Sequence, residues 1–385
     1  MTPPTVLVLG AGVAGPALAY WLARHGMRPT VVEQAAELRS GGTAVVVKDR
    51  AHAVVEEMGV LPRLRELATT VDAMALLDAN GRRIARIPTS SDRSPSVEVT
   101  RADLSAVLRH AVGDDAEFLF DETVTALEQD GEGVDVTFRR AAPRRFDLVV
   151  GADGVHSAIR GLVFGPERDF VTDLPLYAAS VPVSPDLVDD PREMLLLNAP
   201  GRMLAIHPSR TTPVALFTFR GPRVDGYDGY DRHDTALQKR MLAAAYAPLG
   251  WRVPELVATY QEHPAPFFQP LGNLRLPTWS RGRVALVGDA ASAVALLSDG
   301  SSLAIAGAHG LAAALAAHPG DHAGAFRAYE ADHRPRADAK HRLTGVAAAL
   351  LVPRTRAGLA VRNTLARTVT RATRTPLHDP SATRT

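Results

Sequence analysis

Glycines recur at a fixed spacing near the N-terminus, in the run Gly10-Ala11-Gly12-Val13-Ala14-Gly15. An apolar stretch precedes this run and a helical pattern follows it. In such a strand-to-helix turn Gly10 permits the sharp bend, Gly12 lets the backbone approach a pyrophosphate, and Gly15 allows close packing of helix and strand. The start of the helix, at Val13 and Ala14, supplies amide donors and a positive dipole. The pattern predicts a dinucleotide-binding turn.

A carboxylate at the end of the next strand fits the same kind of site. Glu33 follows the strand pattern Thr30-Val31-Val32 and precedes Gln34. An acid at this place accepts hydrogen bonds from a ribose hydroxyl pair and favours an unphosphorylated ribose, hence FAD or NAD rather than NADP. A structural glycine turn is the alternative, but the flanking strand, helix, strand and acid favour the cofactor. We therefore assign Glu33 and Gln34 to the cofactor site.

Asp153 and Gly154 stand at a second strand-to-helix turn. They follow the run Asp147-Leu148-Val149-Val150-Gly151-Ala152, and a helix is expected from Val155. Taken alone, this motif is equally well a turn with an acid that caps the helix.

Gly288 and Asp289 end a third apolar strand, which runs from Arg283 to Val287. In open α/β sheets ligands bind outside the carboxyl ends of the strands, which is where Asp289 is expected. Beyond it, Asp299-Gly300-Ser301-Ser302 opens a strongly apolar helix whose first amides can face an anionic group.

The bulk composition indicates a globular protein. The chain has 385 residues, 46% of them hydrophobic, which suggests about two domains. Its 43 basic and 42 acidic side chains give a net charge of +1, so nothing points to nucleic acid as a partner. The absence of cysteine excludes disulfides, thiol nucleophiles and cysteine-ligated metals, and no histidine spacing suits a metal.

The N-terminus shows no secretory signal, and the apolar stretch from Leu303 to Ala317 is too short to span a bilayer. We therefore expect a soluble cytoplasmic protein with no membrane partner. For the oligomeric state we expect a monomer or a weak homodimer.

Two kinds of secondary-structure pattern along the chain predict its domain organisation. Strand and helix patterns alternate at both ends of the sequence, whereas the middle has short β-like runs separated by Pro and Gly. The expected fold class is α/β, with a Rossmann-like cofactor domain at 1–167 and 281–345. A β-rich substrate domain at 168–280 interrupts it. A C-terminal helix at 346–375 and a disordered tail at 376–385 follow.

Taken together, the three motifs resemble the fingerprints of the class A flavoprotein monooxygenases, the family of para-hydroxybenzoate hydroxylase. The residues of these motifs are most similar to those of actinobacterial members related to the tetracycline-inactivating monooxygenases. The likeness runs from about Thr5 to Asn363. It implies a FAD-binding domain, tightly bound FAD and transient NADPH or NADH. It also implies oxygenation of an aromatic or polyketide-like small molecule by O₂ through a C4a-hydroperoxyflavin, with no catalytic side chain required.

The resemblance also distributes roles over the site. It implies that the first glycine motif and Glu33 hold the ADP half of FAD, that Asp153 and Gly154 contact FAD and NAD(P)H, and that Asp289 binds a ribityl hydroxyl and the pyrophosphate region. Arg101 matches an arginine at the ribityl and phosphate region, with an exposed helix-start arginine as the alternative. Further residues assigned to the cofactor site are Arg39 and Gly42, in the loop toward the isoalloxazine, and Val124, Gly288, Gly300, Ser301 and Ser302.

Two departures from the family pattern bear on the chemistry. Leu296 stands where the family usually has proline, in a segment that normally lies against the reactive edge of the flavin, and Asp299 would add a negative charge there. Lys48-Asp49-Arg50 stands where relatives often read Arg-Gly-Ala. These departures keep two alternatives open: a FAD enzyme with a non-oxygenating reaction, such as a reductase or redox-neutral cyclase, and a non-catalytic ligand-binding descendant.

The substrate is expected between the flavin and the β-rich insertion. Alternate residues of two predicted strands share a face, which suits an apolar pocket with one polar handle. The residues predicted to line it are Met203, His207, Phe217, Phe219 and Leu296. A core role is the alternative for the histidine and the aromatic pair.

The C-terminal stretch from Arg354 to Arg374 carries six arginines and no acids. We expect a helix with a solvated basic face that packs across both domains, with a membrane-surface helix as the alternative.

Overall fold

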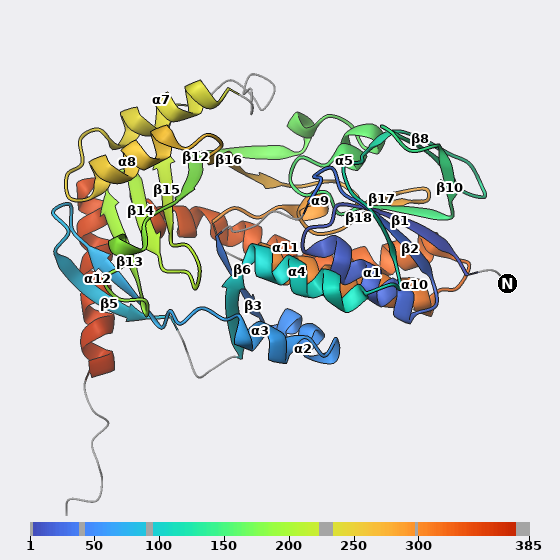
Figure 1. Cartoon of the computed structure of the whole chain (residues 1–385), viewed down its shortest axis with the longest axis horizontal. Coiled ribbons are helices and arrows are strands. Elements are labelled where there is room, and N and C mark those ends of the chain that lie inside the picture. Colours follow the sequence, from blue (N-terminus) through green and yellow to red (C-terminus); the bar gives the residue numbers. More distant parts are fainter. Residues whose placement is uncertain (1–2, 38–42, 90–94, 223–233, 297–298, 375–385) are drawn as a thin grey trace, which may run out of the picture.

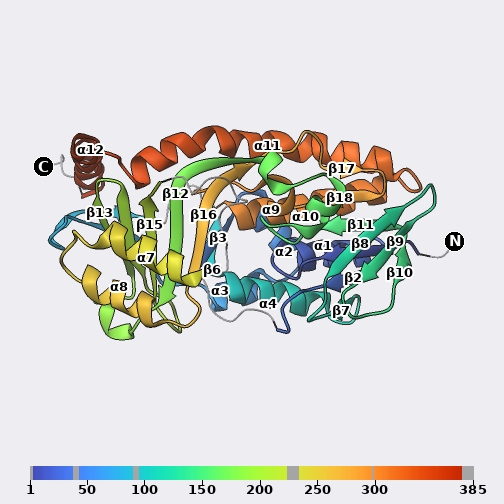
Figure 2. The ribbon, with the colours of Figure 1, turned by 90° about the horizontal axis from the view of Figure 1, so that it is seen from above.

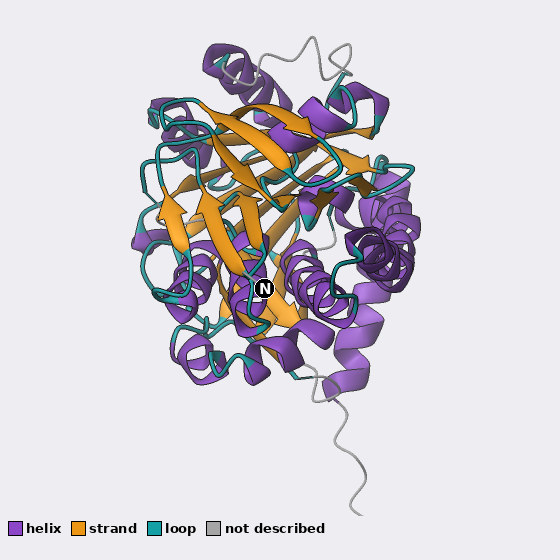
Figure 3. Cartoon of the chain, turned by 90° about the vertical axis from the view of Figure 1, so that its right-hand side faces the viewer, coloured by secondary structure: helices purple, strands orange, loops and turns teal. Residues whose placement is uncertain are grey.

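The computed structural model describes residues 3–37, 43–89, 95–222, 234–296 and 299–374. The chain forms two halves, each built around its own large sheet, and the helix α11 (His322–Leu351) runs along both of them (Figures 1 and 2). Strands lie in the interior and helices on the outside (Figure 3).

The first half contains a six-stranded sheet in the order β17-β18-β11-β1-β2-β7. Its strands are parallel from β18 to β7, and β17 is antiparallel to β18. The bounds are β1 Thr5–Leu9, β2 Arg28–Val32, β7 Glu117–Leu119, β11 Leu148–Gly151, β17 Ser280–Arg281 and β18 Val284–Leu286. Its central strands are apolar along their whole length because both faces of a parallel sheet are covered.

Helices and two small sheets complete this half. The helices are α1 Ala14–Arg24, α2 Arg50–Glu57, α3 Leu61–Glu66, α4 Arg101–Val112, α5 Ala158–Val163, α9 Asp289–Ser292 and α10 Gly300–Ala317. One small sheet pairs β3 (Ala44–Lys48) with β6 (Ser96–Thr100), and the other joins β8 (Val124–Gln129), β9 (Val134–Phe138) and β10 (Arg144–Phe146).

Among the described helices, only α10 is long and apolar enough to cross a membrane by length and composition. It packs against α1, α2 and α11, and 56% of its apolar window is buried inside the protein. Its apolar character is therefore that of a core helix.

The second half contains a seven-stranded sheet in the order β16-β12-β15-β14-β13-β4-β5. Its bounds are β4 Ala73–Leu77, β5 Arg83–Pro88, β12 Val171–Pro182, β13 Glu193–Ala199, β14 Arg202–His207, β15 Val214–Arg220 and β16 Phe267–Leu274. The helices α7 (Thr235–Tyr246) and α8 (Val253–Glu262) cover one face, which we call the outer face; the opposite face is the inner face. Two single-turn 3₁₀ helices lie at Glu167–Asp169 and Pro185–Leu187.

The predicted domain boundaries need one correction. Residues 73–88, which the sequence assigned to the cofactor domain, form β4 and β5 and extend the seven-stranded sheet, with β4 parallel to β13. Their pairing partner lies more than one hundred residues away along the chain, so no local pattern indicates it.

The C-terminal region holds two helices rather than one. The helix α11 ends at Leu351, and α12 (Arg356–Arg374) follows and lies against β5 and β13. It is α11 that spans both halves, whereas α12 packs on the seven-stranded sheet at one end of the protein (Figure 2). The predicted tail at 376–385 lies outside the described residues.

Candidate functional site

The glycine turn after β1 has the geometry that its sequence predicts. Gly10 has a φ of 109°, and a Cβ there would lie 2.5 Å from the carbonyl oxygen of Ala152. A Cβ on Gly15 would overlap the carbonyl oxygen of Gly10, so α1 can approach β1 only with glycine at that position. A Cβ on Gly12 would meet no protein atom within 4 Å, which leaves its backbone open to a ligand.

Glu33 fixes the same turn from the end of β2. Its two carboxylate oxygens accept hydrogen bonds from the backbone amides of Ala11, at 2.8 Å, and Ala35, at 2.9 Å. The carboxylate is therefore held beside the open backbone at Gly12. The side chain of Gln34 is exposed, and that of Val124, at the start of β8, is only 3% exposed and packs in the core.

Asp289 lies where three elements meet. It follows Gly288, whose φ is 63° and where a Cβ would lie 3.0 Å from the Cβ of Ala14 in α1. One carboxylate oxygen of Asp289 faces Gly300, the first residue of α10. No hydrogen bond from a described residue reaches this carboxylate. The glycine turn, Asp289 and the start of α10 thus surround one place at the carboxyl ends of β1 and β18.

Electrostatics at Asp289 are set by burial and by Arg101. Burial raises the pKa of the Asp289 carboxyl, and the nearby charge of Arg101 opposes the increase. Arg101 is exposed and begins α4 after Thr100, whose hydroxyl accepts from the Asp103 amide at 3.0 Å. The structure therefore brings Arg101 to Asp289 from a distant part of the sequence.

Asp153 acts as a helix-capping acid at the end of β11. Its Oδ2 accepts hydrogen bonds from the amides of Ala158, at 2.6 Å, and Ile159, at 3.2 Å. Burial raises the pKa of the Asp153 carboxyl. The neighbouring Gly154 has a φ of 82° and open space beside it, so its backbone is accessible to a ligand.

Arg160 is a structural residue that the sequence analysis missed. It is fully buried, and its guanidinium donates to the carbonyl of Ala290 at 3.2 Å and to Glu167 at 2.6 Å. It thereby ties α5 to the backbone directly after Asp289. An arginine two turns beyond an Asp-Gly motif has no local feature that distinguishes it from a surface residue.

Ser301 and Ser302 are buried at the start of α10. The hydroxyl of Ser302 donates to the carbonyl of Val46 at 2.9 Å and accepts from the amide of Lys48 at 3.2 Å. The first turn of α10 is thus fixed against β3, and the Ser302 hydroxyl is used for that contact.

The two departures from the family pattern meet in space. Asp299, directly before α10, is 5% exposed and forms ion pairs with Lys48 of β3, at 2.5 Å, and with Lys340 of α11, at 2.6 Å. Two cations therefore flank one buried carboxylate, and the cluster carries a net positive charge. In the sequence Lys48 and Asp299 are separate departures from the family pattern, and Lys340 was not anticipated, because nothing in the spacing of the three residues indicates that they meet.

Leu296 adopts a φ of 70°, which is unusual for a leucine. It packs against an apolar cluster formed by Leu176, Ala348 and Val352, and Met203 packs against the same cluster. Two of the predicted substrate residues, Met203 and Leu296, are therefore brought to one region on the inner face.

Phe217 and Phe219 do not share a face with Met203, so the core role, which was the alternative for this pair, is the one the structure supports. Both are buried on the outer face, where they pack edge-to-face with Tyr246 of α7. They belong to the core under α7 and α8. Alternation along β15 correctly groups the two rings, but it does not reveal which face the helices cover.

His207 lies at the far end of β14 and contacts Glu98 of β6, with 3.2 Å between Nε2 and Oε1. Glu98 also accepts from the hydroxyl of Thr69 at 2.5 Å. Burial raises the pKa of Glu98, but its hydrogen bond and attraction to His207 outweigh burial, so the net pKa is lowered. This pair joins the two halves, and Glu98 was not anticipated from the sequence. Arg39 and Gly42 lie outside the described residues.

The parallel sheet and its glycine turn are those of a dinucleotide-binding protein, and a second half is built around a seven-stranded sheet. Residues 4–344 match the family model described as an FAD binding domain. The chain belongs to this family, that of the class A FAD-dependent monooxygenases.

Individual relatives agree with this assignment. The chain is 38% identical over 336 residues to an uncharacterized protein of Mycobacterium tuberculosis, with 85% of this chain and 89% of the relative covered. It is 30% identical over 343 residues to a flavin-dependent monooxygenase of Legionella longbeachae, with 88% and 87% covered. Among solved structures, it is similar to the tetracycline destructase Tet(51), with a TM-score of 0.83, 27% identity and 96% of each chain covered.

These findings confirm the predicted family, the α/β fold and FAD as the cofactor. The enzyme is an oxidoreductase that uses NAD(P)H and O₂, as is typical of the family. The open backbone at Gly12 and Gly154 and the Asp289 carboxylate without a described donor fit FAD, since they offer room for a pyrophosphate and an acceptor for ribityl hydroxyls.

Proposed function

We propose that this enzyme oxygenates an aromatic or polyketide-like small molecule bound between FAD and the inner face of the seven-stranded sheet. The observation that carries the proposal is the shared apolar cluster of Met203, from that sheet, and Leu296, from the segment before α10. Apolar walls with few polar groups are typical of such sites. The resemblance to a tetracycline destructase supports a polycyclic substrate of this kind.

For the cofactor, we propose that the turn at Gly10 to Gly15 and Glu33 hold the ADP half of FAD. We propose that Arg101 and Asp289 hold the ribityl and phosphate region, with the amides of Gly300, Ser301 and Ser302 near the isoalloxazine. When bound, FAD accepts a hydride from NADPH or NADH and reacts with O₂. The residues of this chain position it and exclude water.

The start of α10 contributes electrostatically to this chemistry. The N-terminus of a helix of eighteen residues, from Gly300 to Ala317, carries a positive partial charge that stabilises an anion at its first amides. Lys48 and Lys340 neutralise Asp299 there and leave an excess of positive charge. The arrangement favours a negative charge on a reduced ring near these amides.

A second candidate is a FAD enzyme with a non-oxygenating reaction. It is motivated by Leu296, whose positive φ and place in the segment before α10 depart from the family's proline. A changed segment at the oxygen-reacting edge alters which reaction the reduced flavin undergoes.

The experiment that separates the two begins with the visible spectrum of the purified protein. We expect a yellow protein that NADPH or NADH bleaches without air and that recovers its colour when O₂ is admitted. With a tetracycline or a smaller phenolic compound present, an oxygenating enzyme yields a product heavier by one oxygen atom. If the flavin is bleached by NADPH or NADH but hydrogen peroxide is the only product formed from O₂ with every compound tested, the result would instead support the non-oxygenating enzyme.

We further propose that the protein acts in the cytoplasm as a monomer or a weak homodimer, without nucleic-acid or membrane partners. Sedimentation velocity at several protein concentrations tests the oligomeric state. A single species whose size is independent of concentration and larger than a dimer would contradict it.

A further inference from the structure

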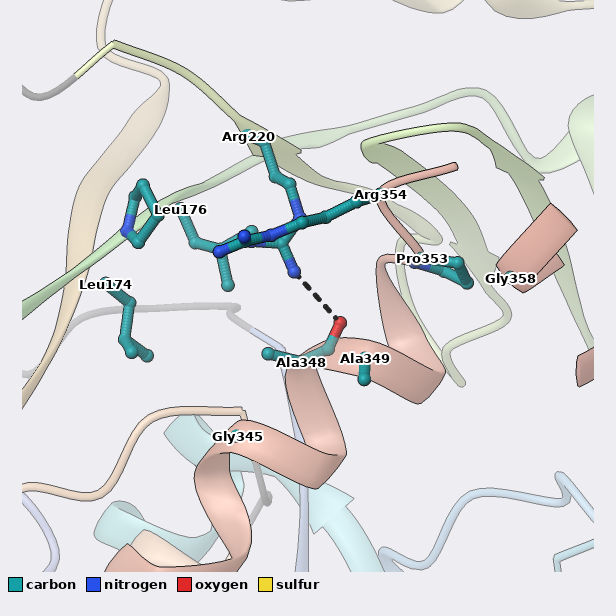
Figure 4. A pocket seen from close by; sticks show the side chains of 10 residues that line it. Leu174, Leu176, Arg220, Gly345, Ala348, Ala349, Pro353, Arg354 and Gly358 are labelled. Carbon is teal, nitrogen blue, oxygen red and sulfur yellow. Dashed lines mark hydrogen bonds between the residues drawn. The ribbon is translucent and has the colours of Figure 1, made fainter. Parts of the chain in front are cut away.

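A cavity of about 390 Å³ lies between β12, β15, the end of α11 and the link to α12. Its walls include Leu174, Leu176 and Ala348, and the charged groups that reach it are those of Arg220 and Arg354 (Figure 4). Small-molecule sites have volumes of roughly 300 to 1,000 Å³, apolar walls and a few placed polar groups. The cavity has the size and lining of such a site.

Arg220 is held at the cavity by the end of α11. Its Nε donates to the carbonyl of Val352 at 3.1 Å. Its Nη2 donates to the carbonyl of Ala348 at 3.3 Å, the bond that is drawn in Figure 4. Ala348 belongs to the last turn of α11 and Val352 is its C-cap residue, so both carbonyls lie at the negative end of the helix, where a cation is favoured. Burial lowers the pKa of Arg220, and the charge of Arg354 lowers it further. Two like charges therefore lie close together beside an apolar space.

Neither arginine forms an ion pair with an acid among the described residues. Some other arginines of this half do form such pairs: Arg86 pairs with Glu193 and Asp72, and Arg252 pairs with Asp189. Repulsion between Arg220 and Arg354 costs free energy that an anion placed between them would recover. A guanidinium also presents a planar set of donors that matches a carboxylate.

The cavity adjoins the segment before α10. Leu176 and Ala348, which line it, belong to the same apolar cluster against which Leu296 and Met203 pack. A ligand in the cavity is therefore one side chain away from the region proposed for the oxidised part of the substrate.

We propose that this cavity binds the anionic end of the substrate, so that the substrate is an apolar small molecule with a carboxylate or an ionised phenol or enol. Its apolar body lies along Leu174, Leu176 and Ala348, and its charge lies between Arg220 and Arg354. This inference rests on the proposed function, because it names the class of substrate for that enzyme.

The test compares two probes of equal shape, 2-naphthoate and 2-naphthamide, by isothermal titration calorimetry on the FAD-loaded protein at neutral pH. We expect naphthoate to bind at least about tenfold more tightly than naphthamide. Arg354→Gln should remove most of that preference and leave naphthamide binding unchanged. Arg342→Gln is the matched control, because Arg342 is exposed on α11 and does not line the cavity.

A second variant fills the cavity without disturbing the fold. Gly345 lines the cavity in α11, and a Cβ there would meet no protein atom within 4 Å. Leucine at this position favours the helix more than glycine does. Gly345→Leu should therefore abolish binding of both probes. Gly161→Leu is the control, since Gly161 lies in α5 with equally open space and away from the cavity.

Three outcomes would each overturn the inference: no detectable binding of naphthoate at about 1 mM, equal affinity for the two probes, or unchanged binding in Gly345→Leu. The proposed function is read separately, from NADPH-dependent bleaching and O₂ uptake by the same protein. If one of these three binding results is found together with normal O₂ uptake, only the proposed substrate class is refuted. Naphthoate binding without flavin reduction refutes only the monooxygenase.

Discussion

At Gly12 the backbone leaves room for a ligand, whereas at Gly15 it leaves no room even for a methyl group. The two glycines of one motif therefore serve different purposes: Gly15 allows the packing of α1 on β1, and Gly12 leaves the space in which we propose that the cofactor binds. The same distinction separates Oδ2 of Asp153, which caps α5, from the carboxylate of Asp289, which receives no hydrogen bond from a described residue.

This distinction predicts the behaviour of Gly12→Val. The added side chain meets no protein atom at its Cβ, so the free energy of unfolding of the FAD-free protein should stay within about 0.5 kcal/mol of the wild type. FAD affinity should fall at least about tenfold, which corresponds to roughly 1.4 kcal/mol. Fluorescence titration with FAD and urea unfolding measure the two quantities.

Gly131→Val is the matched control for that experiment. Gly131 lies in the turn between β8 and β9, also with no atom within 4 Å of a Cβ, and it is remote from the cofactor motifs. Wild-type FAD affinity in Gly12→Val would show that the open backbone at Gly12 is not used by the cofactor.

Asp289→Asn tests the carboxylate itself. Because burial raises the pKa of Asp289, the ionised form costs folding stability, and this cost appears as pH rises from the usual aspartate range of about 4 through the raised value. The variant without FAD should therefore be more stable than the wild type at pH 7. The gain should shrink as pH falls and vanish below about pH 4, where the carboxyl is protonated in both the folded and unfolded states.

Urea unfolding of the two FAD-free proteins at a series of pH values measures this difference. The affinity of Asp289→Asn for FAD should nevertheless be lower than that of the wild type, because the asparagine side chain lacks the negative charge and has one hydrogen-bond acceptor fewer. A variant that is less stable than the wild type at pH 7 would contradict the sign of the pKa shift.

At the scale of elements, the segment before α10 is where β3, α10 and α11 are joined. Ser302 fixes α10 to β3 by hydrogen bonds, and Asp299 connects the same two elements to α11 through Lys48 and Lys340. The position of the first turn of α10 thus depends on three elements at once. Its amides are the group proposed to lie near the flavin ring.

A double-mutant cycle on Asp299 and Lys340 tests how much their ion pair, which connects the start of α10 to α11, contributes to stability. Removing one partner of a buried ion pair leaves a charge that is poorly compensated. We expect Lys340→Met to destabilise the protein by about 1 to 3 kcal/mol, and Asp299→Asn by at least as much, because it leaves Lys48 and Lys340 facing each other. The double variant should be less destabilised than the sum of the two single variants.

Denaturant unfolding gives the four free energies of that cycle. Arg336→Met provides the surface control, since Arg336 pairs with Asp332 on the exposed side of α11. Additive effects of the two substitutions would show that the ion pair contributes no coupling energy.

At the scale of the whole molecule, α11 and the contact between His207 and Glu98 join two halves that have separate cores. We have proposed that FAD lies at the carboxyl ends of the parallel strands in the first half and faces the inner face of the seven-stranded sheet in the second half. A ligand at such a junction binds the assembled protein and not the unfolded chain, so it stabilises the native state by mass action.

FAD should therefore raise the melting temperature of the FAD-free protein. At a free FAD concentration of one hundred times Kd, the stabilisation is about 2.7 kcal/mol. Differential scanning calorimetry with and without FAD measures it. Gly12→Val should show a much smaller increase at the same FAD concentration, and an equal increase would locate FAD elsewhere.

Much of the cofactor site could be predicted from sequence because its signals are local. Gly10, Gly12 and Gly15 constrain one turn, and an acid after the next strand constrains its neighbour, so short-range sterics and hydrogen bonding determine the motif. Parallel strands that are buried on both faces leave continuous apolar runs, which identify the α/β half in the same way.

The remainder depended on tertiary contacts that no local pattern encodes. Alternation grouped Phe217 with Phe219 but did not show that α7 and α8 cover that face, since a strand has the same period whichever side is buried. The pairing of β4 with β13, the cluster of Lys48, Asp299 and Lys340, and the approach of Arg220 to the end of α11 join residues far apart in the chain. The sequence by itself determined the cofactor and the class of fold. Which face of the seven-stranded sheet is covered by helices, the charge cluster and the cavity were decided only by the tertiary structure, because they depend on contacts between residues far apart in the chain.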